Sequence, residues 1–190
     1  MKGPAARLRP GDAILVVDVQ VDFCPGGSLP VNGGDQVVPV LNRWLEAARA
    51  QAIPVYASRD WHPPGHISFE ERGGPWPPHC VQESPGARYH PQLGLPDGAV
   101  EIRKGVHPDR DQYSAFEQTG LAEKMRERGI RRLWVGGLAQ DVCVRASVLD
   151  GLEQGFEVHL IAAATRPVEA EAGRGATLEM ERAGAIIEEE

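Results

Sequence analysis

The chain has 190 residues, a length typical of one domain with a sizeable core, and we expect a single domain over residues 1–190. Its formal net charge of −7 argues against nucleic acid and anionic membranes as partners. No window is apolar enough to cross a bilayer, the N-terminal segment lacks the layout of a signal peptide, and the three cysteines have no regular spacing, so we expect a cytoplasmic, reduced protein.

Apolar runs alternate with helical patterns along the chain. Strands are predicted at 13–19, 53–59, 99–104, 131–138 and 156–162, with a sixth near 185–189. Helices are predicted from 35 to 48 and over 121–128, 141–154 and 170–183. This alternation predicts an α/β fold with three layers (α/β/α) around a mainly parallel, doubly wound sheet of about six strands.

The segment 60–98 is predicted to be a long loop rich in proline, glycine and histidine. A loop of that length inside a compact domain is usually functional or disordered. It contains Asp60, His62, His66 and His79. An aspartate with two or more histidines directly after a strand fits a divalent metal ion that keeps open positions for water or substrate.

Each of the first four predicted strands delivers one reactive side chain at its carboxyl end. These side chains are Asp18, Asp60, Lys104 and Cys143. Ligands of parallel sheets bind beyond that edge, so we expect the four groups to converge. Asp18 lies inside an apolar stretch, where a carboxylate needs a partner or its pKa rises, and Lys104 is placed to keep it ionised.

Cys143 falls in the first turn of a predicted helix, within "VGGLAQDVCVRAS". The helix dipole and the free N–H groups of that turn favour a thiolate and can hold an oxyanion. A plain structural interpretation remains open for each group: Asp18 as a turn cap, Lys104 as a solvated strand end, and Cys143 as a small core hydrophobe. We expect Cys24 and Cys80 to pack near the site.

Six segments, in chain order, resemble one known family. They are "VVDVQVDFCPGGSLPV", "RDWHPPGHISF", "WPPHCVQ", "EIRKG", "YSAF" and "GGLAQDVCV", and they span residues 13–148. The family is the nicotinamidase/pyrazinamidase branch of the isochorismatase-like cysteine hydrolases. The resemblance implies hydrolysis of nicotinamide to nicotinate and ammonia through a cysteine thioester, in NAD salvage, with pyrazinamide as a further substrate.

The resemblance also implies roles for single residues. The catalytic triad falls on Asp18, Lys104 and Cys143, and the metal ligands fall on Asp60, His62 and His79. His66 matches a histidine that some members add as a fourth ligand, and Glu70 and Glu71 are weaker candidates for that place. One divalent metal ion is implied, zinc first, with iron and manganese as alternatives.

The same resemblance places a cis peptide between Leu138 and Ala139, and an oxyanion hole at the N–H groups of Ala139 and Cys143. The expected pocket residues are Phe23, Trp76, Tyr113 and Leu138. Val21 and Gln140 depart from the family pattern, which commonly has asparagine and threonine there, so the fine substrate preference stays open.

Three rival functions remain at this point. They are another amidase or carbamoyl hydrolase of the same superfamily, a binding module without catalysis, and a metal-dependent hydrolase in which the cysteine is idle. The expected partner is a small-molecule substrate, and the sequence leaves open whether the chain forms a homo-oligomer.

Overall fold

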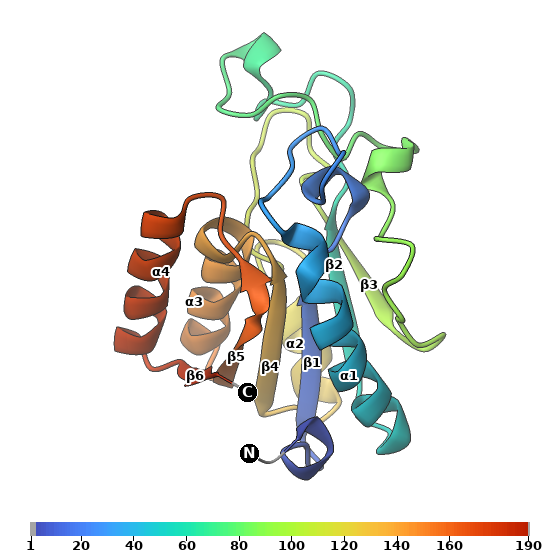
Figure 1. The fold of residues 1–190 in the computed structure, drawn as a ribbon, viewed down its shortest axis with the longest axis vertical. Coiled ribbons are helices and arrows are strands. Elements are labelled where there is room, and N and C mark those ends of the chain that lie inside the picture. Colours follow the sequence, from blue (N-terminus) through green and yellow to red (C-terminus); the bar gives the residue numbers. More distant parts are fainter. Residues whose placement is uncertain (1–2, 190) are drawn as a thin grey trace.

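The computed structural model describes residues 3–189, which contain one six-stranded sheet with helices on both faces (Figure 1). The strands are β1 Asp12–Val17, β2 Val55–Asp60, β3 Val100–Lys104, β4 Arg132–Leu138, β5 Glu157–Arg166 and β6 Ile186–Glu188. The α-helices are α1 Val37–Ala50, α2 Leu121–Glu127, α3 Arg145–Glu153 and α4 Ala170–Arg182.

The strand order is β3-β2-β1-β4-β5-β6, and every neighbouring pair is parallel. The chain therefore starts in the middle of the sheet and winds outward in both directions, which confirms the predicted doubly wound α/β fold. Among residues 3–189, no helix is long and apolar enough to span a membrane.

Different helices cover the two faces of the sheet. Ile14 and Val16 of β1 pack in the cluster that contains α1, whereas Leu15 and Val17 pack in the cluster that contains α2, α3 and α4. This follows from the alternation of side chains along a strand. All of β1 is buried, as expected for a central parallel strand, so polar groups that follow it enter a desolvated region.

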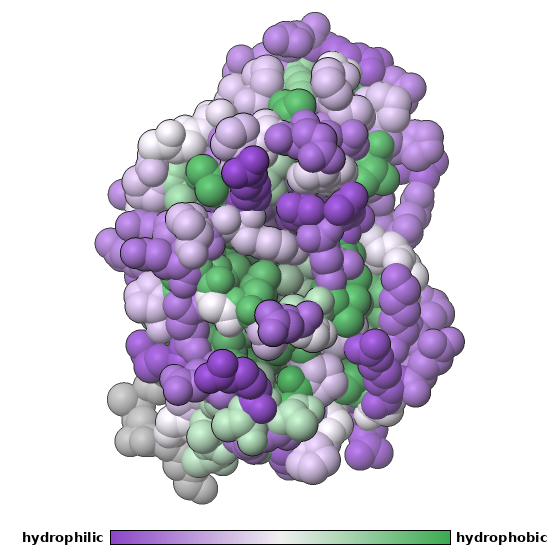
Figure 2. Space-filling view, turned by 90° about the vertical axis from the view of Figure 1, so that its right-hand side faces the viewer, coloured by the Kyte–Doolittle hydropathy of each residue, from purple (hydrophilic) through white to green (hydrophobic). Residues whose placement is uncertain are grey.

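The long connections lie beyond the carboxyl ends of β1, β2 and β3, at the top of Figure 1. Isolated bridges tie these loops together: Gln20 pairs with Tyr89, and His62 with Val81. On the side of the molecule seen in Figure 2, hydrophobic residues gather near the middle of the face, while hydrophilic residues dominate its rim. The isolated bridges thus connect the loops to one another, beyond the carboxyl ends of the strands.

Two predicted elements differ from the structure. The helix expected over 141–154 begins with a π-helical turn, Gln140–Val144, and becomes α-helical at Arg145. The strand expected over 156–162 continues to Arg166 through a register shift against β4. Two of its four added residues are alanine, which carries little strand signal of its own, and pairing with β4 brings all four into the strand.

Candidate active site

The ends of four adjacent strands bring the predicted reactive side chains together. Asp18 follows β1, Asp60 ends β2, Lys104 ends β3, and Cys143 lies in the π turn after β4. Asp60 and Lys104 are direct partners in the β2–β3 register, so their side chains leave the same face of the sheet. Asp18 adopts a positive φ of 48°, which turns the chain sharply where the strand ends.

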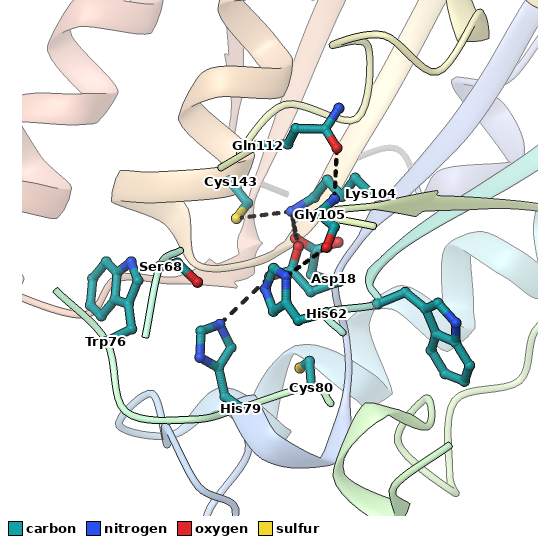
Figure 3. A network of polar contacts seen from close by, with 12 residues as sticks. Asp18, His62, Ser68, Trp76, His79, Cys80, Lys104, Gly105, Gln112 and Cys143 are labelled. Carbon is teal, nitrogen blue, oxygen red and sulfur yellow. Dashed lines mark hydrogen bonds and ion pairs between the residues drawn. The ribbon is translucent and has the colours of Figure 1, made fainter. Parts of the chain in front are cut away.

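Lys104 is the centre of this cluster (Figure 3). Its Nζ lies 2.8 Å from Asp18 Oδ2, 2.5 Å from Asp60 Oδ1 and 3.4 Å from Cys143 Sγ. The Lys104 and Asp18 side chains are fully buried. Oxygen atoms of Asp18 and Asp60 and the Cys143 sulfur all lie within 4.8 Å of one another. One ammonium group therefore contacts a carboxylate, a thiol and a second carboxylate at once.

Burial decides the protonation of the thiol and of Asp18. Loss of solvent raises the pKa of the Cys143 thiol well above its usual range, although Lys104 opposes that shift. Burial also raises the pKa of Asp18, again against the pull of Lys104. The helix start favours a thiolate at Cys143 and Lys104 favours an ionised Asp18, but desolvation outweighs both effects and raises both pKa values, so Cys143 rests as a thiol that Asp18 must deprotonate.

The other two groups stay charged. Burial acts to lower the pKa of Lys104, but Asp18 and Asp60 outweigh it and raise that pKa well above its usual range. Burial acts to raise the pKa of Asp60, but Lys104 and His62 outweigh it and lower that pKa below its usual range. The cluster thus holds a permanent cation, a permanent anion and a proton-accepting carboxylate beside the thiol.

The π turn presents Cys143 to the site. The amides of Val142 and Val144, on either side of Cys143, both donate to the carbonyl of Ala139 at 3.1 Å. The peptide bond between Leu138 and Ala139 is cis, as the resemblance implied. Ala139 and Cys143 both line the same pocket, so their backbone groups border the space above the sulfur.

Asp60, His62 and His79 have the geometry of a metal-binding group. One ligand atom from each lies within 4.8 Å of the others, and all three residues are buried. Nδ1 of His62 lies 3.0 Å from the Gly105 carbonyl and Nδ1 of His79 lies 2.8 Å from the Pro77 carbonyl. A carbonyl can only accept, so both Nδ1 atoms carry the proton and both Nε2 lone pairs are free for a metal.

Both Nε2 atoms face the same carboxylate oxygen. Nε2 of His62 lies 3.5 Å and Nε2 of His79 lies 3.9 Å from Asp60 Oδ2. Two imidazoles, with ring orientations fixed by their Nδ1 contacts, and one carboxylate are a donor set that suits zinc, iron and manganese. These three residues therefore fit one divalent ion.

His66 does not join this group. Its Nε2 donates to the Arg110 carbonyl at 2.9 Å, and its Nδ1 lies 2.7 Å from the Ser68 hydroxyl and accepts from the Ser68 amide. No ring nitrogen is left for a metal, and the ring instead stacks on His62 with 4.2 Å between centroids. Glu70 and Glu71 are exposed and lie outside the group. The structure therefore offers no fourth ligand at these three positions.

A pocket of about 430 Å³, including the space at its mouth, opens onto Cys143 and Asp60. Of the predicted wall residues, Phe23, Trp76 and Tyr113 line it, and the Trp76 indole N–H donates to the Tyr113 hydroxyl at 3.2 Å. Leu138 was also expected there, but it is fully buried in the core beside α1 and is not a lining residue. The wall that sequence analysis missed is aliphatic and consists of Leu29, Pro30, Val31, Val142 and Val168.

Two buried polar residues that support the cluster were not predicted. The Ser58 hydroxyl donates to Asp18 Oδ1 at 2.7 Å. The Gln20 side chain accepts from the Asp60 amide and donates to the Asp60 carbonyl, both at 2.8 Å, and also donates to the Ala87 carbonyl. A polar residue inside an apolar run was the available signal for both.

Comparisons with known proteins agree with this geometry. The model of the isochorismatase domain matches residues 12–189. A protein of Escherichia coli K12 named nicotinamidase is 39% identical over 201 residues, which cover 94% of each chain.

Two solved structures are similar over nearly the whole chain. A pyrazinamidase of Pyrococcus horikoshii in complex with zinc superposes with a TM-score of 0.92 at 45% identity, over 94% of this chain and 99% of its own. The protein PnC1 of L. infantum in complex with nicotinate superposes with a TM-score of 0.85 at 40% identity, over 93% of this chain and 91% of its own.

Proposed function

The chain belongs to the isochorismatase domain family. We propose that it hydrolyses nicotinamide to nicotinate and ammonia through a thioester on Cys143. Pyrazinamide is a second substrate in this proposal, and the physiological setting is NAD salvage in the cytoplasm, with residues 1–190 acting as one catalytic domain. The observation that carries the proposal is the contact of one buried ammonium, Lys104, with Cys143, Asp18 and Asp60.

The first half-reaction forms the thioester. Asp18 takes the proton from the Cys143 thiol as the sulfur attacks the amide carbonyl carbon. The raised pKa of Asp18 makes it a stronger base than an ordinary aspartate, which reduces the cost of that proton transfer. The C–N bond then breaks, Asp18 returns the proton to the nitrogen, and ammonia leaves. Lys104 stays protonated and stabilises whichever of the two groups carries the negative charge.

The second half-reaction releases the acid. Asp18 takes a proton from water, the hydroxide adds to the thioester carbonyl, the C–S bond breaks, and Asp18 returns the proton to the departing sulfur to restore the Cys143 thiol. In both half-reactions the N–H groups of Ala139 and Cys143 hold the oxyanion in our proposal. The amides that flank Cys143 are occupied by the Ala139 carbonyl, which favours Cys143's own amide as the donor toward the pocket.

In this proposal the pocket and one divalent ion orient the substrate, and the ion is zinc. Asp60, His62 and His79 would hold the ion, which when bound supplies a Lewis acid for the pyridine nitrogen of the ring. Phe23, Trp76 and Tyr113 supply flat walls for the ring.

An ammonia-release assay tests this function. We expect the protein to release ammonia from nicotinamide and pyrazinamide and not from an N-carbamoyl amino acid, and to lose that activity on dialysis against a chelator. Release from the N-carbamoyl compound alone would assign the chain to the rival carbamoyl hydrolases.

His62→Ala tests the metal ligands separately. It removes one of three donors, so metal content measured by mass spectrometry should fall below half of that of the wild type, and nicotinamide should bind more weakly. His90→Ala is the control, because His90 lies outside the group of possible ligands. Unchanged metal content in His62→Ala would refute the ligand assignment.

A further inference from the structure

The aliphatic side chain of Val168 lines the pocket without being part of the core. Val168 follows β5 and is 38% exposed, yet it lines the same pocket as Cys143. It stands in the short connection between β5 and α4, far in sequence from Leu29 and Pro30, which line the pocket as well. An exposed aliphatic group at such a place either is held there or swings away into solvent.

The side chain of Asp141 holds this segment. Its Oδ1 accepts from the Val168 amide at 2.9 Å and its Oδ2 accepts from the Glu169 amide at 3.2 Å. Glu169 is the N-cap of α4, and its own side chain makes no capping bond. The Asp141 carboxylate instead binds the amide of the N-cap residue and the amide before it, at the entry to the helix. A carboxylate is also favoured beside the positive end of the α4 dipole.

The residue before Val168 is fixed by packing. Pro167 has a restricted φ, and it lies so close to Gly173 of α4 that a Cβ added at Gly173 would be 2.6 Å from the Pro167 Cβ. The Val168 backbone is thus fixed from one side by the Pro167–Gly173 contact and from the other by Asp141.

Asp141 is also part of the turn that carries the nucleophile. It precedes Cys143 by two residues within the π turn Gln140–Val144. The same turn therefore positions the sulfur through its backbone and the pocket wall through the Asp141 side chain. A change in the backbone of this turn would therefore also move Val168.

We propose that Asp141 is a positioning residue that fixes Val168 as a wall of the substrate pocket, and that this wall limits which substituted pyridine amides the enzyme accepts. This inference rests on the proposed function. Position 5 is the only ring carbon that is bonded neither to the ring nitrogen nor to the carbon that carries the carboxamide, so a substituent there points away from Cys143 and the metal ligands, toward the pocket walls.

The test compares nicotinamide with 5-methylnicotinamide in four proteins: wild type, Val168→Ala, Asp141→Ala and Arg145→Ala. The last is the matched control, because Arg145 ties the same turn region to α4 through a two-pronged ion pair with Glu179, on an exposed part of the surface. The measurements are kcat and KM for each amide, and the Kd of each amide in a Cys143→Ser background, measured by isothermal titration calorimetry.

We expect the preference for nicotinamide over the methylated amide to fall by about 10-fold in Val168→Ala and in Asp141→Ala, because a methyl group in an apolar pocket discriminates by that order. The change should appear in KM and Kd more than in kcat, and Arg145→Ala should keep the wild-type preference. Asp141→Asn, which keeps one acceptor, should lie between wild type and Asp141→Ala.

Two outcomes would overturn the inference. Wild-type preference in Asp141→Ala, with a changed preference in Val168→Ala, removes Asp141 from the positioning role. Wild-type preference in both removes Val168 from the wall. If the wild type binds both amides but releases no ammonia, the proposed reaction fails, while the Kd ratios still decide the inference; if it binds neither, both fail.

Discussion

A buried ammonium is stable only where anions surround it. Lys104 is fully buried, and the negative charges of Asp18 and Asp60 offset its desolvation and raise its pKa. The contact with Lys104 does not fully offset the burial of the Asp18 carboxylate, and the pKa of Asp18 therefore stays above its usual value. The basicity of Asp18 therefore depends on each hydrogen bond that reaches it, and Ser58 donates one of them.

Ser58→Ala should shift the pH dependence of catalysis. The Ser58 hydrogen bond lowers the pKa of Asp18, so its loss raises that pKa further. Asp18 acts as a base only when deprotonated, and the acid limb of kcat/KM should therefore move to higher pH, by about 0.5 to 1 unit for one hydrogen bond.

The control for this shift is the metal content at each pH, since loss of the ion would also reduce activity in acid. Thr119→Ala, which removes a hydroxyl from the start of α2 and leaves Asp18 untouched, should keep the wild-type limb. An acid limb that stays in place in Ser58→Ala, with metal retained, would mean that Asp18 is not the group that titrates.

Gly105 joins β3 to the metal group. It has a φ of +62°, and a Cβ added there would lie 2.3 Å from Cε1 of the His62 ring. Gly129, after α2, has a similar φ of +72° with nothing within 4 Å of an added Cβ. Alanine carries the same left-handed backbone penalty at both positions, about 1 kcal/mol, and only at Gly105 does it also displace a predicted ligand.

We therefore expect both Gly105→Ala and Gly129→Ala to lower the melting temperature, Gly105→Ala by more because of the contact with the His62 ring, and only Gly105→Ala to lower the metal content. Calorimetry and metal analysis of the two purified variants measure this. Equal metal content in both would show that the His62 ring does not need its present position to bind metal.

The elements that could be predicted from sequence are those set by apolar patterning. β1, for instance, was placed within two residues because both of its faces are buried. The π turn and the β5 extension were not, because the first depends on two amides sharing the Ala139 carbonyl and the second on pairing with β4. Leu138 was misplaced because its side chain turns toward α1 while Ala139, the next residue, lines the pocket.

At the site, sequence order and the resemblance predicted which residues to examine, but not their electrostatics. A helix start favours a thiolate at Cys143, whereas the loss of solvent around the buried residue dominates and raises the pKa of its thiol. Gln20 could not be assigned, because its partners at Asp60 and Ala87 are distant in sequence and meet only in the folded chain.

The molecule as a whole places its predicted metal ligands on a segment with little regular structure. Asp60 ends β2, while His62 and His79 lie in the connection to β3, which contains only short 3₁₀ turns. An ion bound to all three would close this connection onto the sheet, and binding to the folded state alone stabilises it by mass action.

Removing the ion should therefore lower the melting temperature and expose residues 60–98 to limited proteolysis, with the first cuts in that segment. Restoring the ion should reverse both effects in the wild type and not in His62→Ala. Cleavage that is independent of metal would indicate that the loop contacts, and not the ion, hold this segment.

The central claim is covalent catalysis by Cys143, and intact-protein mass spectrometry of samples quenched during turnover tests it most directly. We predict one nicotinoyl group per chain, mapped to Cys143, in the wild type. Cys143→Ala should carry no adduct and should release ammonia at least about 10³-fold more slowly, while keeping the wild-type melting temperature. Ammonia release at the wild-type rate by Cys143→Ala, or an adduct mapped to Cys24 or Cys80, would contradict the account.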